Sequence, residues 1–175
     1  TGNALMKNFL MICGMLLTAC LMPPVGAQQG KILYQNDLQK EPLDQVPADF
    51  LVLEGAFSVK EDQGNKFLEL PGAPLDTFGL LFGSAERTNV MVSARIYATA
   101  KGRRFPTFAV GLGGVGGFKL QASPAKKSLE LFQGEKMRAA MPFDWTGDKW
   151  TWLKLRVRAA KPGHWLIEGK AYAEG

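Results

Sequence analysis

Residues 89–123 limit most strongly what this chain can fold into, because they alternate with a period of two residues. Between positions 90 and 96 every second residue is apolar, and the residues between them are mostly polar. The alternation returns in residues 107–112 and 118–121, on either side of a glycine-rich segment suited to a tight turn. This pattern predicts three consecutive strands with one apolar face, which a second sheet must cover.

The rest of the chain repeats this pattern of short strands separated by turn residues. We predict further strands at residues 32–36, 50–54, 56–60, 67–70, 79–82, 128–132, 136–140, 151–158 and 165–173. Glycine, proline, asparagine or aspartate stands between most of them, and no helix is predicted after residue 27. The expected fold is therefore all-β, a two-sheet antiparallel jelly-roll sandwich formed by residues 28–175 as one domain.

The N-terminus has the pattern of a secretory signal peptide. Lys7 precedes the largely apolar segment 9–22, two prolines follow, and the small residues 25–27 form a cleavage site. We expect residues 1–27 to be upstream residues and a signal-peptide helix, with cleavage before Gln28. The domain would then be exported to the periplasm or the extracellular space.

Residues 17–20, Leu-Thr-Ala-Cys, support a second interpretation, because they resemble the lipobox of bacterial lipoproteins. Lipidation of Cys20 would anchor the domain to a membrane, and the sequence gives no other reason to expect membrane contact. Cys13 and Cys20 are the two cysteines of the chain, so cleavage before Gln28 would leave a domain without disulfides.

Charge is distributed unevenly along the chain. Residues 28–86 contain four Lys and Arg against ten Asp and Glu, whereas residues 87–170 contain sixteen against five. The basic half favours an acidic partner such as a polysaccharide, although the two halves of one sandwich could also simply complement each other. A nucleic-acid partner is not expected for an exported protein.

Two groups of residues are candidates for ligand binding. The first is the polar face of the central strands: Arg95, Tyr97, Lys119, Gln121 and Glu130. Arginine and glutamine hydrogen-bond to sugar hydroxyls and tyrosine stacks on sugar rings, although an ordinary solvated sheet face has the same composition.

The second candidate group is the loop that contains Lys101, Arg103 and Arg104, which could bind an acidic sugar or phosphate or could be a solvated hairpin tip. Three tryptophans at 145, 150 and 152 suggest either a stacking platform or packing at a sandwich edge. His164 is the only histidine and precedes an expected strand. We predict no metal site and no cofactor.

Several segments resemble the concanavalin A-like lectin/glucanase superfamily, which includes laminin-G-like and keto-glycoside hydrolase-like domains of exported bacterial proteins. They are LYQNDL at 33–38, FLVLEGAFSV at 50–59, KFLEL at 66–70, VMVSARI at 90–96 and WTWLKL at 150–155. The resemblance implies a jelly roll whose concave face often binds glycan. The Glu-x-Asp-x-(x)-Glu strand of its β-glucan hydrolases does not occur here.

The sequence therefore favours an exported, non-catalytic sandwich module that binds carbohydrate or serves a larger exported assembly. A glycoside-active enzyme with catalytic residues partly beyond Gly175, and a purely structural or adhesion domain, are the alternatives. We also expect the reading frame to continue, with an open sheet edge beside residues 32–36, because that strand has no obvious C-terminal partner.

Overall fold

The computed structural model describes residues 30–71, 77–86, 88–100, 102 and 104–174. The chain divides into two units between Ile32 and Leu33, and every strand belongs to the second unit. The predicted signal peptide, its cleavage site before Gln28 and the alternative lipidation site Cys20 lie outside the described residues.

The second unit is all-β, which confirms that part of the predicted fold class, while the jelly-roll topology stays a prediction. Its strands are β1 (Leu51–Glu54), β2 (Ser58–Asp62), β3 (Asn65–Glu69), β4 (Gly79–Leu81), β5 (Val90–Ala98), β6 (Phe108–Leu112), β7 (Phe118–Ser123), β8 (Ser128–Gln133), β9 (Lys136–Pro142), β10 (Lys149–Lys161) and β11 (His164–Ala173). One 3₁₀ turn, Pro124–Lys126, joins β7 to β8. Within the described ranges, no helix is long and apolar enough to cross a membrane.

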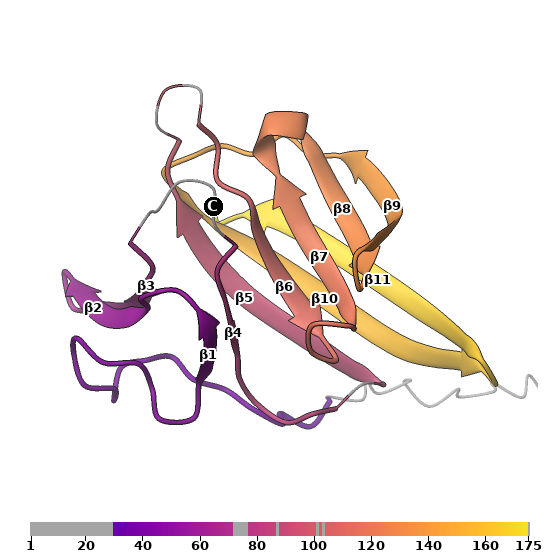
Figure 1. The fold of residues 1–175 in the computed structure, drawn as a ribbon, viewed down its shortest axis with the longest axis horizontal. Coiled ribbons are helices and arrows are strands. Elements are labelled where there is room, and N and C mark those ends of the chain that lie inside the picture. The colour runs from indigo at the N-terminus through magenta and orange to yellow at the C-terminus, as the bar shows by residue number, and fades with distance from the viewer. Residues whose placement is uncertain (1–29, 72–76, 87, 101, 103, 175) are drawn as a thin grey trace, which may run out of the picture. The chain divides into compact units, whose positions relative to one another are not determined.

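Two antiparallel sheets form the body of this unit (Figure 1). The first is a meander in the order β6-β7-β8-β9, whose strands are joined by short turns. The second has the order β11-β10-β5 and brings together strands that lie far apart in the sequence. Two small sheets, β1-β4 and β2-β3, precede them in the chain.

The structure corrects the expectation that β5, β6 and β7 are neighbours in one sheet. β5 pairs instead with β10, from Val90 opposite Val157 to Ala98 opposite Lys149. This partner allows all nine residues of β5 to pair, whereas β6 has only five residues. The link after β5 therefore carries the chain from one sheet to the other.

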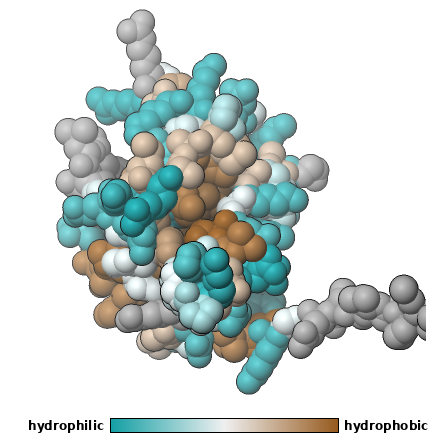
Figure 2. All heavy atoms as spheres, turned by 90° about the vertical axis from the view of Figure 1, so that its right-hand side faces the viewer, coloured by the Kyte–Doolittle hydropathy of each residue, from teal (hydrophilic) through white to brown (hydrophobic). Residues whose placement is uncertain are grey.

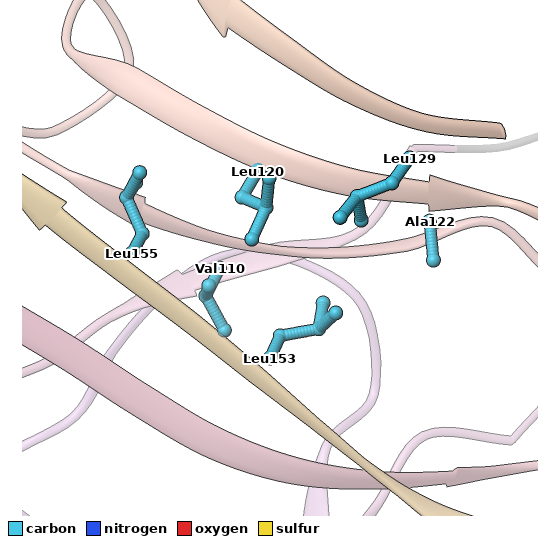
Figure 3. Packing of buried hydrophobic residues seen from close by; sticks show 6 residues of the cluster. All are labelled: Val110, Leu120, Ala122, Leu129, Leu153 and Leu155. Atoms are coloured by element: carbon cyan, nitrogen blue, oxygen red, sulfur yellow. The ribbon is translucent and has the colours of Figure 1, made fainter. Parts of the chain in front are cut away.

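The hydrophobic core lies between the two larger sheets, in a β-sandwich-like arrangement (Figure 3). The meander contributes Val110, Leu120, Ala122 and Leu129, and β10 contributes Leu153 and Leu155. Alternate residues of β5, beginning with Val92, pack against this cluster. The apolar positions that defined the predicted strands thus face inward, as the period of two requires.

Residues 32–36 do not form a strand, which corrects a second expectation. The Tyr34 ring packs against Phe82 and Phe50, with centroid distances of 5.5 and 6.5 Å. Asn36 Oδ1 accepts a hydrogen bond of 2.7 Å from the Leu38 backbone N–H, which closes a local turn. Side-chain packing and this turn hold the segment in place of strand pairing, so the open sheet edge predicted beside a strand at residues 32–36 does not arise.

Candidate functional site

The five residues of the predicted ligand face lie on two different sheets. Arg95 and Tyr97 belong to β5, Lys119 and Gln121 to β7, and Glu130 to β8. Each points away from the core, because each alternates with residues that pack into it. The structure therefore places them on opposite outer faces of the sandwich and does not bring them together into one site.

Glu130 is the centre of a hydrogen-bonded cluster on the outer face of the meander. Its side chain is only 4% exposed. One carboxylate oxygen accepts hydrogen bonds from Ser123 Oγ at 2.9 Å and Gln121 Nε2 at 3.2 Å. The other accepts from Lys126 Nζ and Ser128 Oγ, each at 3.1 Å. Both oxygens are therefore used within the protein, and this cluster holds the β7–β8 hairpin in place.

Opposing effects act on the pKa of Glu130. Burial raises it by disfavouring the charged carboxylate, but hydrogen bonds from Ser123, Lys126 and Ser128 and the positive charge of Lys126 favour that form. The hydrogen bonds and the charge together outweigh burial, so the pKa lies below its ordinary value of 4.5. A group with a depressed pKa in the folded state stabilises the fold above its unfolded-state pKa.

We expect Glu130→Gln to lower the free energy of unfolding at neutral pH by about 1–3 kcal/mol, because the amide nitrogen cannot accept hydrogen bonds from its donors. As pH falls from the ordinary value through the depressed one, the wild type should lose the contribution of Glu130 and approach the variant. Urea unfolding at a series of acidic pH values measures this. Glu135→Gln, in the exposed turn after β8, is the matched control, and parallel pH curves for wild type and Glu130→Gln would contradict the prediction.

Aromatic and cationic side chains meet on the outer face of the other sheet. Strand pairing places Trp150 opposite Tyr97, and Trp152 between Arg95 on β5 and Tyr172 on β11. Lys154 follows on β10, opposite Lys170 of β11. We call this surface the aromatic–cationic face; it consists of Arg95, Tyr97, Trp150, Trp152, Lys154, Lys170 and Tyr172.

The cations of this face lie against its rings. The Arg95 guanidinium is 4.7 Å from the Trp150 ring centroid, and the Lys154 ammonium is 5.5 and 5.4 Å from the centroids of Trp152 and Tyr172. These are cation–π distances. Arg95 is also fixed by a hydrogen bond of 3.0 Å that its Nη2 donates to Asn65 Oδ1. The face thus offers flat rings for stacking beside positive charges.

The predicted site included two members of this face and missed the others. The sequence alone already places Trp150, Trp152 and Lys154 on one side of β10, because they are two residues apart along one strand. Tyr172 and Lys170 join this face only because β11 pairs with β10, and nothing in the sequence around them indicated that pairing. Trp145 belongs elsewhere, since its ring packs edge-on against Phe108 with a centroid distance of 5.9 Å. The three tryptophans therefore do not form one platform.

The second predicted site is described only in part. Arg104 is exposed, whereas Lys101 and Arg103 lie outside the described residues. His164, which was expected to precede a strand at 165–173, is itself the first residue of β11. No group of three or more His, Cys, Asp or Glu side chains that could hold a metal ion occurs in the described part of the chain.

Two shallow depressions occur at the borders of the sandwich. One, of ≈380 Å³, lies at the glycine-rich turn before β7 and is lined in part by Leu112 and Trp165. The other, of ≈210 Å³, lies between Met141 of β9 and Gly169 of β11. Figure 2, seen from the side where Figure 1 shows β9 and the beginning of β11, shows apolar side chains gathered within a hydrophilic surround. Neither depression is lined by an acidic side chain.

No family model, curated protein or solved structure matches this chain. The resemblance to concanavalin A-like domains therefore remains a prediction.

Proposed function

We propose that this chain is an exported, non-catalytic β-sandwich module that binds an acidic glycan on its aromatic–cationic face. The observation that carries the proposal is the arrangement of Arg95 and Lys154 against the rings of Trp150, Trp152 and Tyr172. Rings can stack on the apolar face of a sugar, while cations bind its carboxylate or sulfate groups.

An acidic ligand is favoured over a neutral one because of the charges on this sheet. Arg156 and Arg158 continue the row of outward cations on β10. Two acidic residues lie beside them: Glu168 forms an ion pair with Arg158, and Glu174 forms one of 3.5 Å with Arg95. An acidic ligand would give a partner to Lys154 and Arg156, for which no ion pair occurs among the described residues. A glycan is favoured over nucleic acid because the N-terminal pattern predicts export.

A binding role is favoured over hydrolysis because Glu130, the buried carboxylate, is occupied by four donors and lies on the opposite sheet. A glycosidase needs two carboxylates that flank the scissile bond. A structural or adhesion role would not require cations to lie over aromatic rings on an exposed face.

We expect Arg95→Ala with Lys154→Ala to weaken retention in gels that contain polygalacturonate by about tenfold or more, because each lost charged hydrogen bond is worth about 1.5–3 kcal/mol. Affinity electrophoresis of the full chain measures this loss. The matched control is Lys119→Ala with Lys136→Ala, which removes the same charge from the meander and should leave retention nearly unchanged.

Tyr97→Leu separates stacking from charge. It keeps the net charge and should reduce retention on polygalacturonate by removing a ring that is 48% exposed. If Lys119→Ala/Lys136→Ala lost as much retention as Arg95→Ala/Lys154→Ala, the interaction would depend on net charge alone, which would contradict the proposal. Stronger retention by a single-stranded oligonucleotide than by any acidic glycan would reassign the face to nucleic acid.

A further inference from the structure

β11 has an unpaired edge. It pairs with β10 along its whole length, and among the described residues no strand pairs with its other edge. Most of its side chains are exposed, including Trp165 at 48% and Leu166 at 45%. An exposed edge of ten residues offers a row of free N–H and C=O groups, which favours pairing with another strand.

The edge of the meander, at β9, is less suited to such pairing. β9 ends in Pro142, which has no N–H to donate, and a register shift in its pairing with β8 distorts it. Its charged residues, Lys136 and Arg138, are both cations, so the same edge of a second copy would be repelled. β11 differs because it carries both signs of charge.

The outward residues of β11 complement those of a second, antiparallel β11. If the two strands are centred on Gly169, Glu168 lies opposite Lys170 of the second copy, and Leu166 lies opposite its Tyr172. Centring on Glu168 would place that carboxylate opposite itself, and centring on Lys170 would do the same for the ammonium group. Opposite charges across strands stabilise and like charges destabilise, so the charges select the register centred on Gly169.

We propose that two copies of this chain associate through β11, in antiparallel pairing around a twofold axis at Gly169. A twofold axis makes each contact occur twice, which gives two Glu168–Lys170 pairs per dimer. The two three-stranded sheets then form one continuous sheet of six strands, with both aromatic–cationic faces on the same side. Two faces on one rigid sheet would bind a repeating polymer with higher avidity than either face alone.

Charge reversal tests this register. Sedimentation equilibrium of the full wild-type chain should give twice the monomer mass. Glu168→Lys and Lys170→Glu should each be monomeric, because each places like charges opposite each other. An equimolar mixture of the two variants should restore the dimer, since every facing pair is then opposite in charge, and so should the double exchange Glu168→Lys/Lys170→Glu in one chain.

The mixing result distinguishes β11 pairing from association through the apolar N-terminal segment. Association of the second kind would not depend on the signs of the charges at positions 168 and 170. A monomeric wild type, single variants that associate like the wild type, or a mixture that stays monomeric would each overturn the proposal. The variant Arg95→Ala/Lys154→Ala changes the binding face but not β11, so it should keep the dimer mass while it loses glycan retention. Failure of the dimer and failure of the proposed binding function can therefore be distinguished.

A disulfide test gives the register directly. In a chain with Cys13→Ser and Cys20→Ser, the pair Leu166→Cys/Tyr172→Cys should form a covalent dimer on mild oxidation. The two positions are separated by about 20 Å along one strand, too far for an internal disulfide. Leu166→Cys/Lys170→Cys, which matches the register centred on Glu168, should not cross-link, and preferential cross-linking of this control would overturn the register.

Discussion

Leu155→Ala should lower the free energy of unfolding by about 2–5 kcal/mol, one of the two largest effects we expect in this domain. Leu155 is fully buried at the centre of β10, in the cluster that joins the two larger sheets (Figure 3). Truncation removes buried methyl groups and leaves a cavity. Strand pairing within each sheet keeps the backbone from moving inward to fill that cavity. Chemical denaturation followed by tryptophan fluorescence measures the loss.

The matched control is Leu51→Ala on β1, where the side chain is 61% exposed. Its effect should stay within about 0.5 kcal/mol. If Leu155→Ala does not accumulate as folded protein, Leu155→Val provides a milder change in the same direction. Equal effects at Leu155 and Leu51 would show that the core does not lie between these sheets.

Gly117→Ala should destabilise the domain by about 1–3 kcal/mol or more, because the added Cβ has no space. It would overlap the Leu112 carbonyl oxygen and lie 2.8 and 2.9 Å from the carbonyl carbons of Leu112 and Gly113. These are backbone atoms, so the β6–β7 hairpin must open for the methyl group to fit. Leu112 is paired with Phe118 at this end of the hairpin, and that pairing would be strained.

Gly116→Ala controls for the change in residue type, because nothing lies within 4 Å of a Cβ at that position. Its effect should be small and could be slightly stabilising, since alanine restricts the unfolded chain more than glycine does. Melting temperatures of the two variants decide the matter, and a loss for Gly116→Ala equal to that for Gly117→Ala would refute the steric argument.

Local sequence patterns predicted the strands well and their partners less well. The alternation in residues 90–96 and 151–158 marks β5 and β10 because one side of each strand packs into the core. That alternation does not say which strands pair, since pairing depends on strands distant in the sequence. Residues 32–36 show the same limit, because Tyr34 packs against Phe50 and Phe82 although the segment pairs with no strand.

The candidate site was predicted in part for the same reason. Arg95 and Tyr97 were selected because they are outward residues of a clear strand. Trp152 and Tyr172 join them only through the pairing of β5 with β10 and of β10 with β11. Glu130 was predicted as a ligand residue, but its neighbours Ser123 and Ser128 in the β7–β8 hairpin give it an internal role.

The pairing of β5 with β10 also has a consequence for the order in which the domain folds. The strands of the meander are joined by short turns, so its contacts form at little cost in chain entropy. β5 and β10 can pair only after the chain has closed a loop that contains the whole meander. We therefore expect the meander to form first, as a folding nucleus, and the pairing of β5 with β10 to limit the folding rate. During refolding, the backbone amides of β5 should then be the last to become protected against hydrogen exchange.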